Sequence, residues 1–196
     1  MAKVLHLALH GDYTGITPSS IRRTYEAHQD ITETNNTVKE IRNAFNFIHK
    51  AFQSIEVNPK LKKWSIITLT MIARELMKKY NISDFPEQFA KSFLQFELER
   101  QENADLNEEE QDSKYTAFTN AIRGDDPQNM TYRHSKLIER FLIDMPDLKS
   151  KDNTRMFSIE QRTAIFFKNN GICQDCRCKV SQDDDYEADH ILAHSK

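Results

Sequence analysis

Glycine and proline are scarce in this chain of 196 residues, which contains four glycines and five prolines. Tight turns between β-strands depend on these two residue types, so the composition disfavours a β-sandwich. Long apolar runs are also missing, because no stretch approaches the roughly 20 residues that a membrane-spanning helix needs. The sequence therefore predicts a mainly α-helical protein with no membrane partner.

Cysteine is rare and confined to one place. The three cysteines, Cys173, Cys176 and Cys178, follow one another closely. Such crowding suits metal binding better than a disulfide framework, and it is typical of a reducing compartment. The N-terminal segment MAKVLHLALHGD lacks the pattern of a cleavable secretory signal. We therefore expect a cytoplasmic protein.

An excess of positive charge is missing as well. The formal net charge is −3, so binding to a phosphate backbone would need a local basic surface that the overall composition does not indicate. The segment 102–112 (ENADLNEEEQD) carries acids and no base, and we interpret it as a solvated linker rather than a metal site.

Apolar residues recur at spacings of three and four along several segments, which predicts amphipathic helices packed into a bundle. Ser83 or Asp84 is expected to cap one of these helices, whose residues Phe89, Phe93, Phe96 and Leu98 should face inward. We expect a helical bundle domain over 1–152 and a second, smaller unit over 153–196. The segments with helical spacing are 17–30, 35–57, 58–81, 83–101, 113–124, 128–145 and 157–171.

The smaller unit begins with a predicted helix that Gly171 ends in a left-handed conformation. Cys173 and Cys176 follow as a C-x-x-C pair in a tight turn, from which two thiolates reach one zinc ion at about 2.3 Å. A structural zinc needs four ligands, and no second C-x-x-C occurs in the chain. Cys178 either substitutes for a missing ligand or is a free thiol, and we interpret it as a free thiol.

The segment 186–195 (YEADHILAHS) is predicted as a strand that presents Asp189 and His190 near its end. A carboxylate suits Mg²⁺ or Mn²⁺, and a histidine with an ordinary pKa near 6.5 takes a proton from water at neutral pH. The run 183–185 of three aspartates is interpreted as a solvated turn, and His194 as an exposed side chain. Asp189 and His190 are therefore the candidate hydrolytic pair.

Residues 157–196 resemble the HNH endonuclease family in the order of their features. These are a helix, a glycine, a C-x-x-C pair, a variable loop and the segment YEADHILAHSK. The resemblance implies a ββα-metal module that hydrolyses DNA. Asp189 would be the first ligand of a catalytic Mg²⁺ or Mn²⁺, His190 the general base, and Cys173 and Cys176 half of a structural zinc knuckle. Two residues depart from the family pattern, which has glycine at the position of Arg177 and proline at that of Ala193.

The family motif continues with an asparagine or histidine and a second cysteine pair, which would follow Lys196. The chain is therefore expected to carry a truncated ββα-metal module, the N-terminal half of an HNH domain, completed by a further segment or a second chain. By itself it is expected to bind zinc poorly and to cut DNA weakly or not at all.

The region 13–162 also resembles the C-terminal part of bacterial ParB/sulfiredoxin-like proteins that carry a terminal HNH domain. Such proteins are associated with restriction or phage defence, which the resemblance implies for this chain. The alternative hypothesis, from another class of protein, is a catalytically inactive helical interaction or regulatory module with a degenerate zinc knuckle.

Overall fold

The structure, a computed structural model, describes residues 1–11, 13–55, 60–151, 159–181, 186 and 188. These residues form a mainly helical protein, as the sequence predicts, and contain no β-strand beyond two isolated antiparallel bridges. The ββα unit is not seen in the described ranges. The elements are α1 (Ala2–His10), α2 (Pro18–Ala27), α3 (Asn36–Gln53), α4 (Lys63–Lys79), the 3-10 helix η1 (Ile82–Asp84), α5 (Pro86–Ala104), α6 (Ser113–Ala121), α7 (Pro127–Asp144) and α8 (Ile159–Lys168).

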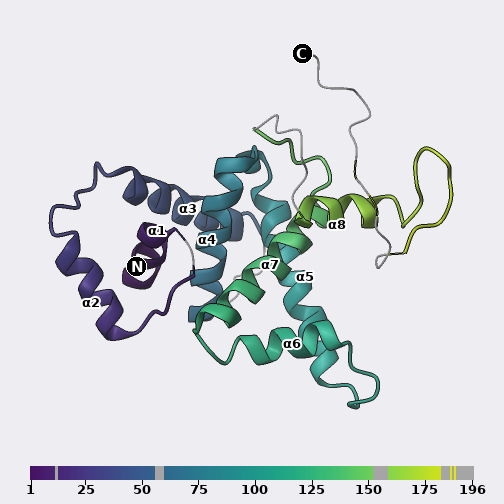
Figure 1. Cartoon of the computed structure of the whole chain (residues 1–196), viewed down its shortest axis with the longest axis horizontal. Coiled ribbons are helices and arrows are strands. Elements are labelled where there is room, and N and C mark those ends of the chain that lie inside the picture. Colours follow the sequence, from purple (N-terminus) through teal and green to yellow (C-terminus); the bar gives the residue numbers. More distant parts are fainter. Residues whose placement is uncertain (12, 56–59, 152–158, 182–185, 187, 189–196) are drawn as a thin grey trace.

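Helices α3, α4, α5 and α7 pack together at the centre of the molecule (Figure 1). Their apolar faces meet in one large core, in which the rings of Phe89 and Phe141 stack with centroids 4.3 Å apart. Burial of such aromatic side chains is the main source of stability for a bundle of this kind. Within the described part of the chain, no helix is both long and apolar enough to cross a membrane.

The predicted helical stripes are mostly confirmed, with two errors at α5. Phe89, Phe93 and Phe96 are buried, but Leu98 is 49% exposed because two residues after Phe96 the helix has turned to its opposite side. The predicted cap is also wrong, since Ser83 and Asp84 belong to the 3-10 helix η1. Helix α5 instead begins after Phe85, without a hydrogen bond from a capping side chain.

Helix α1 was not predicted, because histidines interrupt its apolar pattern. Val4, Leu7 and Ala8 are nevertheless buried, and they form a second core cluster with residues of α3, α4 and α7. The helix ends at Gly11, whose φ of 82° is the left-handed conformation that glycine adopts without strain.

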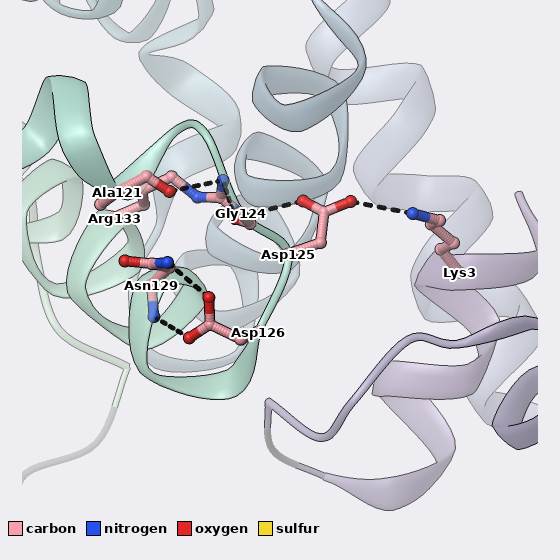
Figure 2. A network of polar contacts seen from close by, with 7 residues as sticks. All are labelled: Lys3, Ala121, Gly124, Asp125, Asp126, Asn129 and Arg133. Carbon is pink, nitrogen blue, oxygen red and sulfur yellow. Dashed lines mark hydrogen bonds and ion pairs between the residues drawn. The ribbon is translucent and has the colours of Figure 1, made fainter.

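A buried arginine connects α1 to the bundle, as Figure 2 shows. Arg133 of α7 is fully buried, and its Nη1 donates to the carbonyl oxygens of Ala121 at 3.1 Å and Gly124 at 3.0 Å. Its Nη2 lies 3.2 Å from Asp125 Oδ1, and Asp125 Oδ2 accepts from Lys3 Nζ at 2.8 Å. The charge of this buried side chain is therefore paired, as burial of a guanidinium requires.

Helix α8 packs against α7, and Ala164 contacts the main core. In the segment that follows α7, Lys151 N donates to Lys79 O at 2.7 Å, which joins this segment to the end of α4. The proposed domain boundary near residue 152 lies outside the described residues, so the division into 1–152 and 153–196 stays a prediction.

Candidate metal centre

The three cysteines lie in a short hairpin that begins where α8 ends. Asn170 and Gly171 both have left-handed φ angles, 53° and 64°, and they reverse the chain after the helix. A Cβ atom at Gly171 would lie 2.9 Å from the carbonyl oxygen of Val180, closer than such atoms approach one another. The predicted left-handed stop at Gly171 is confirmed, and only glycine fits there without displacing the backbone at Val180.

Backbone hydrogen bonds hold the hairpin closed. Ile172 and Lys179 form an antiparallel bridge, and Cys173 N donates to Cys178 O at 3.0 Å. At the tip, Arg177 N donates to Cys173 O at 3.0 Å, and Arg177 itself has a left-handed φ of 62°. The backbone therefore places Cys178 opposite Cys173, with Cys176 in the turn between them.

The three thiols converge as a result. Their sulfur atoms all lie within 4.8 Å of one another, and none of the three cysteines forms a disulfide. Cys173 is half-buried, whereas Cys176 and Cys178 are exposed. Three soft donors on one short hairpin form a ligand set that suits zinc.

Hydrogen bonds between the thiols change their acidities in opposite directions. The Cys178 thiol and backbone, with a smaller contribution from the Cys173 thiol, lower the pKa of Cys176. The same hydrogen bond raises the pKa of Cys178. Since the thiolate is the species that binds a metal, Cys176 becomes available as a ligand before Cys178 as pH rises.

The donor set fits zinc in its dimensions as well as in its chemistry. Tetrahedral zinc with bonds of about 2.3 Å holds its sulfur ligands about 3.8 Å apart. The thiols already lie within 4.8 Å of one another, so small side-chain rotations bring them to bonding distance. Three thiolates leave one position of the tetrahedron for a further ligand.

Two of these three ligands, Cys173 and Cys176, are the pair that the sequence predicts, and the structure brings them together. The interpretation of Cys178 as a free thiol differs from the structure, which places its sulfur in the same cluster. The C-x-x-C-x-C spacing could have predicted this third ligand. If the chain reverses its direction after Cys176, the side chain of Cys178 comes to lie close to that of Cys173.

The predicted hydrolytic residues, Asp189 and His190, lie outside the described residues, as do the aspartate run 183–185 and His194. Most of the predicted strand over 186–195 lies outside them too. Tyr186 is described, and its ring lies beside that of Phe166 on α8, with centroids 5.4 Å apart. The segment that leads to Asp189 therefore begins next to the helix that carries the hairpin.

Comparisons with protein-family models, with curated proteins and with solved structures find no match to this chain. The resemblance to the HNH family therefore stays a prediction from the sequence.

Proposed function

We propose that this chain carries the front half of an HNH-type, metal-dependent endonuclease module that cuts DNA, with a zinc knuckle formed by Cys173, Cys176 and Cys178. The observation that carries the proposal is the convergence of three thiols in a hairpin that follows a helix and its left-handed glycine. In the sequence, Asp189 and His190 follow this hairpin after residues 181–188, which is the order of features typical of the family.

Each part of the module would have a separate task. Zinc at the thiols would hold the hairpin to α8 and take no part in the chemistry. Asp189 would bind a Mg²⁺ or Mn²⁺ ion, which supplies charge stabilisation for phosphodiester hydrolysis. His190 would accept the proton of the attacking water. The remaining ligands would come from a further segment or from a second chain.

A cytoplasmic role in restriction or phage defence is part of the same proposal. It is supported by the resemblance of region 13–162 to the bacterial ParB/sulfiredoxin-like proteins that end in an HNH domain. The helical bundle would then connect the nuclease module to the element that selects its target.

The test is nicking of supercoiled plasmid by the protein expressed from its complete reading frame, in Mg²⁺ or Mn²⁺. We expect nicking that EDTA abolishes and that His190→Ala reduces by at least a hundredfold, as loss of a general base does. The control is His49→Ala, which changes an exposed histidine of α3 and should leave nicking unchanged. Nicking that survives His190→Ala would contradict the assignment.

A second candidate function, the helical interaction or regulatory module, is favoured by one observation. Leu98 and Leu106 are 49% and 47% exposed near the end of α5, and exposed apolar side chains are found at protein interfaces. If the protein binds zinc stoichiometrically but leaves plasmid intact in both metals, this second function replaces the first.

A further inference from the structure

Helix α2 contacts the rest of the protein along one narrow side. Of its ten residues, Thr24 is buried, Ser20 and Ile21 are half-buried, and the others are exposed. Figure 1 shows the helix at the outer edge of the molecule beside α1, away from the central bundle. Because a helix of this length is marginal in water on its own, specific contacts must hold it in place.

Those contacts come from α1 and from the turn that joins the two helices. The Thr24 hydroxyl oxygen lies 2.6 Å from His6 Nδ1 and 3.3 Å from His10 Nε2. Ser20 Oγ donates to Gly15 O at 2.6 Å. Helices α1 and α2, which residues 11–17 connect, therefore form a pair in which the first helix is embedded in the core and the second is presented outward.

The outward face of α2 is polar and carries two arginines. Ser19, Arg22, Arg23 and Glu26 follow the i, i+3, i+4, i+7 spacing of one helical face, and all four are exposed. At 100° per residue, this face lies opposite the side formed by Ser20, Ile21 and Thr24. Helix α2 therefore packs on α1 through the side that carries Thr24, and the opposite face, with Arg22 and Arg23, is exposed to solvent.

The charges on this face are only partly neutralised within the protein. Arg22 Nε lies 3.5 Å from Glu26 Oε1, and both side chains are well exposed. Arg23 forms no ion pair with any residue that the structure describes. The helix also begins at Pro18, directly after its capping residue Thr17, and the partial positive charge of its N-terminus favours an anion.

We propose that α2 is a DNA-reading helix, which lies in the major groove of double-stranded DNA with its Ser19–Arg22–Arg23–Glu26 face against the base edges. The choice of DNA as the polyanion rests on the proposed nuclease function, but the binding face is independent of the metal centre. The proposal makes α1–α2 the part of the chain that selects a sequence.

The dimensions and the side chains of α2 suit this partner. An α-helix with its side chains is about 10–12 Å across, and the major groove is about 12 Å wide. Arginine donates two hydrogen bonds to guanine, and glutamate accepts one from cytosine. The Ser19 hydroxyl, which lies 3.0 Å from that of Thr17, can donate or accept and so suits a base edge of either kind.

The experiment selects duplexes from a randomised pool with the full chain in EDTA, and then measures anisotropy with the enriched duplex. Arg22→Ala/Arg23→Ala should weaken binding at least tenfold and reduce the salt dependence by about one to two counterions. The matched control is Lys39→Ala/Arg42→Ala, which removes the same charge from exposed positions of α3 and should change the affinity less than threefold.

A charge-conserving variant tests base reading separately from attraction. Arg22→Lys/Arg23→Lys should keep binding to random duplex within threefold but lose the preference for the enriched sequence, because lysine lacks the planar pair of donors. Three results would each overturn the proposal. The α3 control could weaken DNA binding as much as the α2 variant, the wild-type chain could enrich no sequence, or the chain could bind vesicles that contain phosphatidylserine more tightly than DNA. Because EDTA prevents cleavage, loss of binding and loss of nicking are scored independently.

Discussion

Glu75 Oε2 lies 2.7 Å from His134 Nε2, which joins α4 to α7. The other ring nitrogen of His134 hydrogen bonds with the hydroxyl of Tyr13, in the turn after α1, and Lys79 Nζ donates to Glu75 Oε1 at 2.6 Å. Burial by itself would raise the pKa of Glu75, but the hydrogen bonds from His134 and Lys79 outweigh it and lower the pKa to about 2.

This carboxylate should make stability depend on pH in the acid range. Its pKa in the folded protein lies below the ordinary value of 4.5, so its contribution is complete above pH 4.5 and is lost as pH falls toward 2. Glu75→Gln should reduce the free energy of unfolding at pH 7 by about 1–2 kcal/mol, after allowance for its partial exposure. The variant should also lose less stability than the wild type between pH 4.5 and 2.5, measured by urea unfolding.

The control for this prediction is Glu87→Gln, at an exposed carboxylate that pairs with Lys91 one turn along α5. Exposed pairs of this kind contribute little, so the expected change at pH 7 is below about 0.5 kcal/mol. An equal effect of the two substitutions would show that the contacts of Glu75 do not stabilise the fold.

Arg133 should be among the residues that the fold tolerates least. Arg133→Met keeps the length of the side chain but leaves the carbonyls of Ala121 and Gly124 without their donor and removes the partner of Asp125. We expect a loss of about 3 kcal/mol in the free energy of unfolding. Arg123→Met, at an exposed arginine nearby, should change it by less than about 0.5 kcal/mol. Similar losses in the two variants, measured by urea unfolding, would contradict this role.

The third thiol of the candidate metal centre is tested by the zinc content of the purified chain. With three converging thiols, the chain should bind zinc better than the sequence leads us to expect, and Cys178→Ser should reduce the zinc content to a small fraction of the wild-type value, because two thiolates alone form an incomplete site. Asp175→Asn, in the same hairpin, should keep its zinc. If elemental analysis finds the wild-type zinc content in Cys178→Ser, Cys178 is a free thiol, as the sequence alone predicts.

The long helices could be predicted because their apolar residues repeat with the helical period, as in α3 and α4. Helix α1 could not, because the buried His6 depends on Thr24, eighteen positions away in the sequence, and local periodicity does not show such a partner. Arg133 escaped prediction for the same reason, since two of its acceptors are the backbone carbonyls of Ala121, at the end of α6, and of Gly124, in the loop that follows. The roles of Asp189 and His190 stay predictions.

Cys178 was misinterpreted because the conformation of Arg177 decides where its sulfur lies. The family pattern has glycine at this position, and a left-handed turn is easily predicted from glycine. Arginine gives no such signal, although its φ of 62° is in the left-handed region. The turn is therefore formed by a residue that is less suited to the left-handed region than glycine.

This strain gives the last prediction, which concerns zinc affinity. The left-handed region costs a residue with a Cβ atom about 1 kcal/mol relative to glycine. Part of this gain is lost in Arg177→Gly, because glycine has the greater conformational entropy in the unfolded chain. The substitution should therefore tighten zinc binding by about twofold to fivefold. Arg177→Val should weaken it, because a β-branched residue is the least tolerated there. Both affinities are measured by competition with a chelator. Shifts in the same direction for glycine and valine would mean that the backbone at Arg177 does not control the thiol cluster.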